Sequence, residues 1–249
     1  MAPASALLLA IAVSLLAWRA GALGRSGALA AAGIGLLVLT TTGWPGGLVL
    51  MAFFLPSSAV SRLWPGRAPA IDAKGDRRDA WQVLANGGFP ALALTLGGPG
   101  ALLAFAAGLT AAAADTWATA VGAHSASPPR HIFRGEVVPA GTSGGMTPLG
   151  TGGALVGAAL VAVSALPLVG WRGAVGALLI GMGGMLLDSA LGASVQGRFH
   201  CDRCGLSSER RMHRCGQATR SVGGIPWLSN DGVNALASLA ATAAGWAAS

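Results

Sequence analysis

Long apolar runs recur from one end of this chain to the other. Of the 249 residues, 53% are hydrophobic and 10% are charged, and the mean hydropathy is +0.62. A helix of about 20 apolar residues crosses a bilayer, so the sequence predicts an all-α, polytopic transmembrane helical bundle. No repeat or soluble segment interrupts the pattern, and we expect one integral membrane domain. The eight expected spans are 4–18, 27–42, 46–60, 81–96, 98–122, 150–169, 173–196 and 226–246.

Arginine residues gather in alternate connections between these spans. The first, third, fifth and seventh connections carry nearly all of them, whereas Arg172 alone lies in an even-numbered connection. Because cytoplasmic loops are enriched in Lys and Arg, we expect a protein of the cell inner membrane with its long loops in the cytoplasm and both termini outside. The formal net charge of +7 favours phosphates and acidic membrane lipid as partners, and no nucleic acid is expected. The alternative is that the arginines serve topology alone.

Two carboxylates fall inside expected spans. Asp115 lies in 98–122 and Asp188 in 173–196. A charged side chain at the bilayer centre costs at least about 2.5–3.5 kcal/mol, which makes such a residue a functional candidate. Asp231 opens the last span from the same face, and carboxylates from three helices supply the hard oxygen ligands of a Mg²⁺–nucleotide site. The alternative is that each carboxylate only pairs with a neighbouring helix.

Residues that suit phosphate binding lie near these carboxylates. Arg77 and Arg78 precede the fourth span, Arg130 lies in the fifth connection, and each guanidinium can bind phosphate bidentately. Asn86 interrupts the fourth span, and Thr119 lies one turn after the first aspartate on the same helix face. The charged residues 72–76 are interpreted as a solvated segment beside the membrane.

A glycine-rich segment precedes the sixth span. Its backbone N–H groups and hydroxyls can turn toward an anion, and a helix N-terminus follows. It lacks the Gly-Lys-Ser/Thr ending of a Walker A loop, so its significance depends on sharing a membrane face with the arginines and carboxylates. Its residues are Gly141, Thr142, Ser143, Gly144 and Gly145.

The three cysteines predict a separate metal site. Two residues separate Cys201 from Cys204, and His213 and Cys215 follow in the same connection. Three Cys and one His complete a tetrahedral zinc site, and disulfides are disfavoured in the cytoplasm. Such a fully ligated ion would be structural. The alternative is three free thiols and a surface histidine.

Six motifs occur in order between Ala80 and Asn234. They are Gln82-Val-Leu-Ala-Asn86-Gly, Ala114-Asp115-Thr116-Trp-Ala-Thr-Ala-Val-Gly122, Pro129-Arg130, Val138-Pro-Ala-Gly141-Thr142-Ser-Gly-Gly145, Asp188-Ser189-Ala-Leu-Gly192-Ala and Asn230-Asp231-Gly-Val-Asn234. The order resembles the integral membrane family that contains plant and cyanobacterial phytyl-phosphate kinase and the animal protein called transmembrane protein nineteen. The run from Asp115 followed by Gly-Thr is also similar to the polyprenol and dolichol kinases that use CTP.

The resemblance implies an enzyme that phosphorylates an isoprenyl, phytyl-like monophosphate to the diphosphate. A nucleoside triphosphate, with CTP expected, would be the donor and Mg²⁺ the cofactor. A phosphate monoester has a second pKa of about 6, so the acceptor needs charge neutralisation rather than a strong base. The expected metal ligands are Asp115, Asp188 and Asp231, the expected catalytic cations are Arg77, Arg78 and Arg130, and the expected nucleotide-binding residues are Asn86, Thr119, the glycine-rich segment, Asn230 and Asn234.

Two other classes of membrane protein remain as alternatives. A transporter or flippase of an anionic lipid also uses broken helices and buried carboxylates, but inverted-repeat symmetry is then expected and none is visible in the sequence. A CDP-dependent lipid phosphotransferase also places aspartates at the cytoplasmic face. Its two pairs of closely spaced aspartates are missing here.

Overall fold

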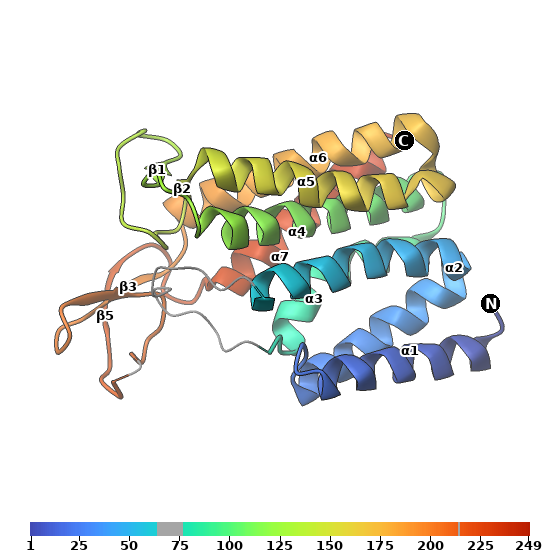
Figure 1. Ribbon diagram of the computed structural model, residues 1–249, viewed down its shortest axis with the longest axis horizontal. Coiled ribbons are helices and arrows are strands. Elements are labelled where there is room, and N and C mark those ends of the chain that lie inside the picture. The colour runs from blue at the N-terminus through green and yellow to red at the C-terminus, as the bar shows by residue number, and fades with distance from the viewer. Residues whose placement is uncertain (64–76, 214) are drawn as a thin grey trace.

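The computed structural model describes residues 1–63, 77–213 and 215–249. In this part of the chain, seven helices run roughly parallel to one long axis and form a bundle (Figure 1). The expected charged segment 72–76 lies outside the described residues. The helices are α1 (Pro3–Arg19), α2 (Arg25–Leu63), α3 (Ala80–Leu96), α4 (Ala101–Gly122), α5 (Pro148–Ser164), α6 (Leu166–Ser194) and α7 (Asn230–Ala247).

Helix α2 contains two expected spans joined by a sharp reversal. Gly43 has φ 65° and ψ −148°, a backbone conformation that costs glycine little and other residues much. Pro45 follows, and the two arms run back alongside each other in Figure 1. The predicted break near Trp44 therefore lies where the chain reverses.

The break expected between the sixth and seventh spans is confirmed at Gly170, which has φ 67° inside α6. The helix bounds differ from the expected spans, because α5 ends at Ser164 and α6 begins at Leu166. Ala165 between them keeps a right-handed helical backbone. Helices α2, α4 and α6 are long and apolar enough to cross a membrane, and α1 and α5 are shorter apolar helices. The chain is thus a mostly helical membrane protein, and the number of eight spans stays a prediction.

Three helix starts follow directly from local sequence. Asp79 accepts a hydrogen bond from the Gln82 backbone, while the Gln82 side chain accepts from the Asp79 backbone, which makes a capping box at α3. Thr147 caps α5 through the Gly150 N–H at 3.0 Å, and Ser229 caps α7. These caps satisfy backbone donors that a helix start leaves unpaired.

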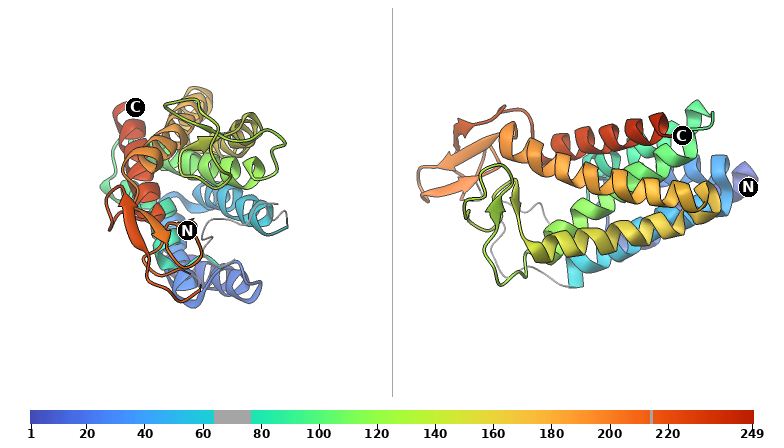
Figure 2. Two further views of the ribbon diagram at one scale, coloured as in Figure 1. Left: turned by 90° about the vertical axis from the view of Figure 1, so that its left-hand side faces the viewer. Right: turned by 90° about the horizontal axis from the view of Figure 1, so that it is seen from above.

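Helix α4 is the centre of the bundle. It contacts α2, α3, α5, α6 and α7, and the end view in Figure 2 places it between these neighbours. Most of its residues from Ala104 to Ala114 are buried, including Phe105 and Leu109 in the main core. Small residues allow this close approach, because a Cβ on Gly108 would lie 2.4 Å from the Thr242 hydroxyl. Close backbone packing of this kind holds helices together in lipid.

Two helix connections contain short strands, so the expectation of an all-helical chain was incomplete. The first forms the pair β1 (Arg130–His131) and β2 (Gly145–Met146). The second forms an antiparallel sheet in the order β4-β3-β5, with β3 at Arg198–Cys201, β4 at Leu206–Ser208 and β5 at Arg220–Gly223. Within each connection, the strands hydrogen-bond to one another beyond the helix ends. Both termini lie at the opposite end of the bundle (Figure 1).

Candidate active site

Asp115 and Asp188 meet where α4 contacts α6. Their carboxyl groups lie within hydrogen-bonding reach of each other. Asp188 is buried, and Asp115 is half-buried. Two carboxyl groups this close cannot both hold a full negative charge unless a proton or a cation lies between them. The two expected metal ligands therefore form a pair that can bind a cation.

Four helices line a small cavity at this pair. Asn86 comes from α3, the two aspartates from α4 and α6, and Asn234 and Ser238 from α7. Among the described residues, Asp188 Oδ2, Asn234 Oδ1 and Ser238 Oγ are buried there without a hydrogen-bond partner. Leaving such an atom unpaired costs about 1–3 kcal/mol, so a ligand that bonds to several of them at once is favoured.

The chemistry and size of this cavity fit a divalent cation. Carboxylate, amide and hydroxyl oxygens are hard ligands of the kind that Mg²⁺ takes. The free volume is about 10 Å³, roughly one water-sized sphere. The cavity therefore suits one ion or one water, and a nucleotide would have to bind outside it.

The glycine-rich segment lies against the same helix as Asp188. Gly144 has φ 77°, and a Cβ there would lie 2.4 Å from the Ala193 side chain and 2.8 Å from the Ser189 carbonyl. Only glycine therefore allows this approach to α6. The next residue toward the N-terminus, Ser143, donates its hydroxyl proton to the Glu209 carboxylate from the β-sheet connection. The negative charge of Glu209 is also close enough to Asp188 to repel the charge of that carboxylate.

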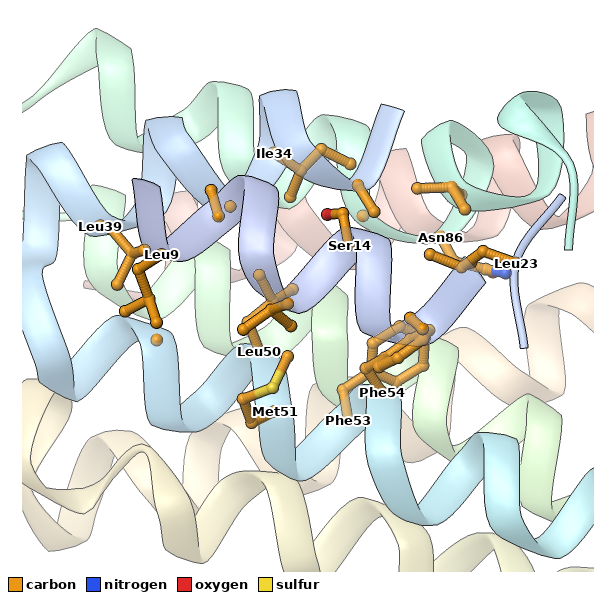
Figure 3. Close-up of a pocket in the computed structure, with 18 of the residues that line it drawn as sticks. Leu9, Ser14, Leu23, Ile34, Leu39, Leu50, Met51, Phe53, Phe54 and Asn86 are labelled. Atoms are coloured by element: carbon orange, nitrogen blue, oxygen red, sulfur yellow. The ribbon is translucent and has the colours of Figure 1, made fainter. Parts of the chain in front are cut away.

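A second cavity, of about 170 Å³, lies between α1, α2 and α3. Its walls are almost entirely apolar. Figure 3 shows Leu9 and Leu39 toward one end, Ser14 in the middle, and Leu23 and Asn86 toward the other end. Asn86 also lines the carboxylate cavity. One side chain thus borders both an apolar cavity and a candidate metal site.

Arg78 also lines the apolar cavity. Its backbone pairs with the α1–α2 connection, since Gly24 N–H donates to the Arg78 carbonyl at 2.9 Å. Its guanidinium lies 5.7 Å from the Phe53 ring and 6.0 Å from the Phe54 ring, distances at which cations and aromatic faces attract. Burial lowers the pKa of Arg78 to about 10, so it remains charged at neutral pH.

Arg77 does not line the apolar cavity. Its side chain is exposed and lies near Gly21, beside the Arg62 guanidinium. The two adjacent arginines, expected to act together on phosphate, therefore have different surroundings.

The four expected zinc ligands converge. One ligand atom from each of Cys201, Cys204, His213 and Cys215 lies within 4.8 Å of every other. A hydrogen bond from His213 lowers the pKa of the Cys215 thiol to about 6, and a hydrogen bond with Cys215 raises the pKa of Cys204 to about 11. The Cys215 thiol therefore loses its proton at lower pH than the Cys204 thiol.

Comparison with known proteins identifies the family. The family model described as "Integral membrane protein DUF92" matches residues 8–242. The chain belongs to this family. It is 28% identical over 237 residues to Protein PGR of Arabidopsis thaliana, covering 80% of this chain and 81% of that protein. It is 30% identical over 189 residues to the uncharacterized membrane protein MJ0933 of Methanocaldococcus jannaschii, covering 73% and 78%. No solved structure matches.

Several expected site residues of this DUF92 protein lie away from the carboxylate cavity. Thr119 is exposed on α4. Arg130 donates to the Gly135 carbonyl at 2.7 Å within its own loop. Asn230 is exposed at the start of α7, and Asp231 lies one turn before Asn234, outside the cavity lining.

Two residues beside the candidate site were not expected. Ser238 lies four residues after Asn234, and residues with this spacing share one face of a helix. The helical period in the sequence would therefore have indicated Ser238. Glu209 lies in a connection dominated by arginine. Nothing in the sequence marks its contact with Ser143, because the two residues are 66 positions apart.

Proposed function

We propose that this protein is a Mg²⁺-dependent kinase of an isoprenyl monophosphate, with a nucleoside triphosphate as donor and CTP as the expected one. One observation carries the proposal. Asn86 borders both the apolar cavity and the carboxylate cavity. A prenyl chain in the first cavity would have its phosphate beside the second.

The apolar cavity suits the hydrocarbon part of such a substrate. Its walls come from three helices, and Ser14 and Gln82 are among the few polar residues that line it. A prenyl chain that enters from the bilayer leaves one apolar medium for another, so burial alone adds little affinity. The cavity would therefore select chain length and shape, while polar contacts at the head would supply most of the affinity.

Arg78 is the residue best placed to bind the phosphate of this substrate. It lines the apolar cavity and pairs with Leu23, and Figure 3 shows Leu23 beside Asn86 at one end of that cavity. The contacts with Phe53 and Phe54 hold its guanidinium in place. Guanidinium and phosphate form paired, charge-assisted hydrogen bonds, and a charged group that is already fixed loses little side-chain entropy on binding.

The reaction requires two anions to approach each other. An oxygen of the prenyl monophosphate attacks the γ-phosphorus of the nucleotide, the bond between that phosphorus and the β–γ bridging oxygen breaks, and the nucleoside diphosphate leaves. Bound Mg²⁺ would neutralise charge on the transferred phosphoryl group. Asp115 and Asp188 would hold the cation, Arg78 would bind the acceptor phosphate, and the glycine-rich segment would bind the donor.

The proposed function also implies which end of the helical bundle faces the cytoplasm. The connections that carry the glycine-rich segment and the β-sheet lie at one end of the bundle, opposite both termini (Figure 1). Arginine enrichment favours the cytoplasm for this end, which is where nucleoside triphosphates are found. The active site would thus face the cytoplasm, and the arginine-rich loops would contact acidic lipid headgroups.

The direct test is phosphoryl transfer by the purified protein in lipid nanodiscs. Phytyl monophosphate and Mg²⁺ are incubated in turn with CTP, UTP, ATP and GTP, each labelled at the γ-phosphate. We expect labelled phytyl diphosphate from the wild type, no product with EDTA, and phosphoryl transfer lowered about 100-fold or more in Asp188→Asn. Asp202→Asn is the matched control, since Asp202 is an exposed aspartate in the β-sheet connection.

Other outcomes would identify the alternatives. Movement of a prenyl phosphate across a liposome membrane without any nucleotide would identify a flippase. Release of CMP from a CDP-linked lipid would identify a phosphotransferase. Either result, together with no labelled diphosphate from any of the four nucleotides, would overturn the kinase proposal.

A further inference from the structure

The cysteine and histidine cluster has the dimensions of a zinc site. With Zn–S bonds of about 2.3 Å, two sulfurs of a tetrahedral site lie about 3.8 Å apart. The Sγ atoms of Cys201 and Cys215 are 3.7 Å apart, and His213 Nδ1 lies 3.2 Å from Cys215 Sγ. All four ligand atoms fall within 4.8 Å of one another, so one ion can contact all of them.

Two tight turns present these ligands. Gly205 follows Cys204, has φ 66° and donates its N–H to the Cys201 carbonyl at 2.8 Å. Gly216 follows Cys215, has φ 80° and donates to the His213 carbonyl at 2.9 Å. Each turn therefore ends in a glycine whose left-handed backbone folds the chain back, so that each turn carries two ligands to one point.

A disulfide does not explain this arrangement. A bond between two of the cysteines would need an S–S distance of about 2.05 Å, and it would leave the third thiol and the histidine without a role. Four protein ligands also fill a tetrahedral zinc ion and leave no position for substrate. A metal here would therefore stabilise structure rather than perform catalysis.

The two ligand pairs bracket Glu209 in the sequence. Near it, Ser208 Oγ accepts from the Arg210 N–H at 3.0 Å, and Thr219 donates to the Arg210 carbonyl at 2.5 Å. Glu209 itself accepts the hydroxyl proton of Ser143 and interacts with Asp188. Fixing the ligand pairs thus fixes the segment that reaches the carboxylate site.

We infer that Cys201, Cys204, His213 and Cys215 bind one structural zinc ion, and that this ion holds Glu209 against the glycine-rich segment beside the carboxylate pair. The zinc site stands independently of the enzymatic activity. The role of Glu209, which adds a third negative charge near the Mg²⁺ ligands, rests on the proposed kinase function.

Metal analysis of the intact protein tests the zinc site. Protein purified under reducing conditions without chelators should contain about one zinc per chain. Cys204→Ser and His213→Ala should lose it. His200→Ala is the matched control, because His200 lies on β3 of the same sheet and outside the cluster, and it should keep the metal. A metal-free wild type, or full zinc in His213→Ala, would overturn the inference.

Thiol protection gives a second test if those variants fail to fold. In the wild type, a thiol alkylating reagent should modify the three cysteines slowly, and a strong zinc chelator should make all three react while releasing the ion. Peptide mapping by mass spectrometry reads out each cysteine separately. Rapid alkylation without chelator, or a disulfide between Cys201 and Cys215 under reducing conditions, would contradict the zinc site.

Glu209→Gln separates the two parts of the inference. The amide still accepts the Ser143 proton but has no charge, so we expect full zinc content and a higher Mg²⁺ concentration for half-maximal phosphoryl transfer. Unchanged Mg²⁺ dependence with full zinc would overturn the role of Glu209 and leave the zinc site standing. Absence of kinase activity in every variant and in the wild type would instead contradict the proposed function.

Discussion

Gly184 of α6 packs directly against Ala111 of α4. A Cβ built on Gly184 would lie 2.6 Å from the Ala111 Cβ, closer than two carbon atoms can approach. Gly184 precedes Asp188 by one helical turn, and Ala111 precedes Asp115 by one turn. The contact therefore sets the separation of the two carboxylates, and both small residues also line their cavity.

Gly184→Ala should push α4 and α6 apart. Overpacking of this kind costs about 1–3 kcal/mol, and a displacement of about 1 Å at a reacting centre can lower a rate about 100-fold. We expect a lower melting temperature and a large loss of phosphoryl transfer. Gly183→Ala is the matched control, since a Cβ there meets nothing within 4 Å. Equal activity of the two variants would show that the helix separation does not control the site.

Asp115→Asn and Asp188→Asn test the cation site. Each change keeps the shape of the side chain and removes a negative charge that balances the metal, so phosphoryl transfer should fall about 100-fold or more. Loss of a buried charge should leave thermal stability unchanged or raise it. Activity and melting temperature are measured side by side. Variants that stay active but unfold more easily would assign the aspartates a purely structural role.

Ser14→Phe tests the apolar cavity as the prenyl site. Ser14 is buried on α1 and lines the middle of the cavity, so a phenyl ring there should obstruct a long chain more than a short one. We expect KM for phytyl monophosphate to rise at least about tenfold, while geranyl monophosphate is affected much less. Ser5→Phe is the control, because Ser5 is exposed on the same helix. A uniform loss for both substrates would argue against the cavity as the chain-binding site.

The orientation can be measured with introduced cysteines. Ser125 lies in the connection after α4, and Ser249 lies at the C-terminus at the opposite end of the bundle. In intact cells, an impermeant thiol reagent should label Ser249→Cys and leave Ser125→Cys unlabelled until the cells are opened. Peptide mapping distinguishes these positions from the native cysteines. The reverse pattern would place the candidate active site outside.

Local signals in the sequence predicted much of the helical framework. The break near Trp44 lies at the reversal of α2 because Gly43 and Pro45 act on the backbone directly. The start of α3 follows from Asp79 and Gln82 for the same reason. The short strands were missed, since residues such as Phe199 and Ser208 pair across a turn and carry no strong alternation of their own.

The sequence by itself determined which residues could carry chemistry. A carboxylate in an apolar run is costly wherever the run folds, so Asp115 and Asp188 were visible as candidates, and the spacing of Cys201 and Cys204 indicated a metal site. Tertiary structure decided which candidates meet. Contacts between residues far apart in the chain depend on how the helices pack. Because α4, α6 and α7 approach closely, Asn234 and Ser238 line the carboxylate cavity, whereas Thr119 and Asp231 do not. The same packing places Asn86 between the apolar cavity and the carboxylates, because that position depends on three helices at once.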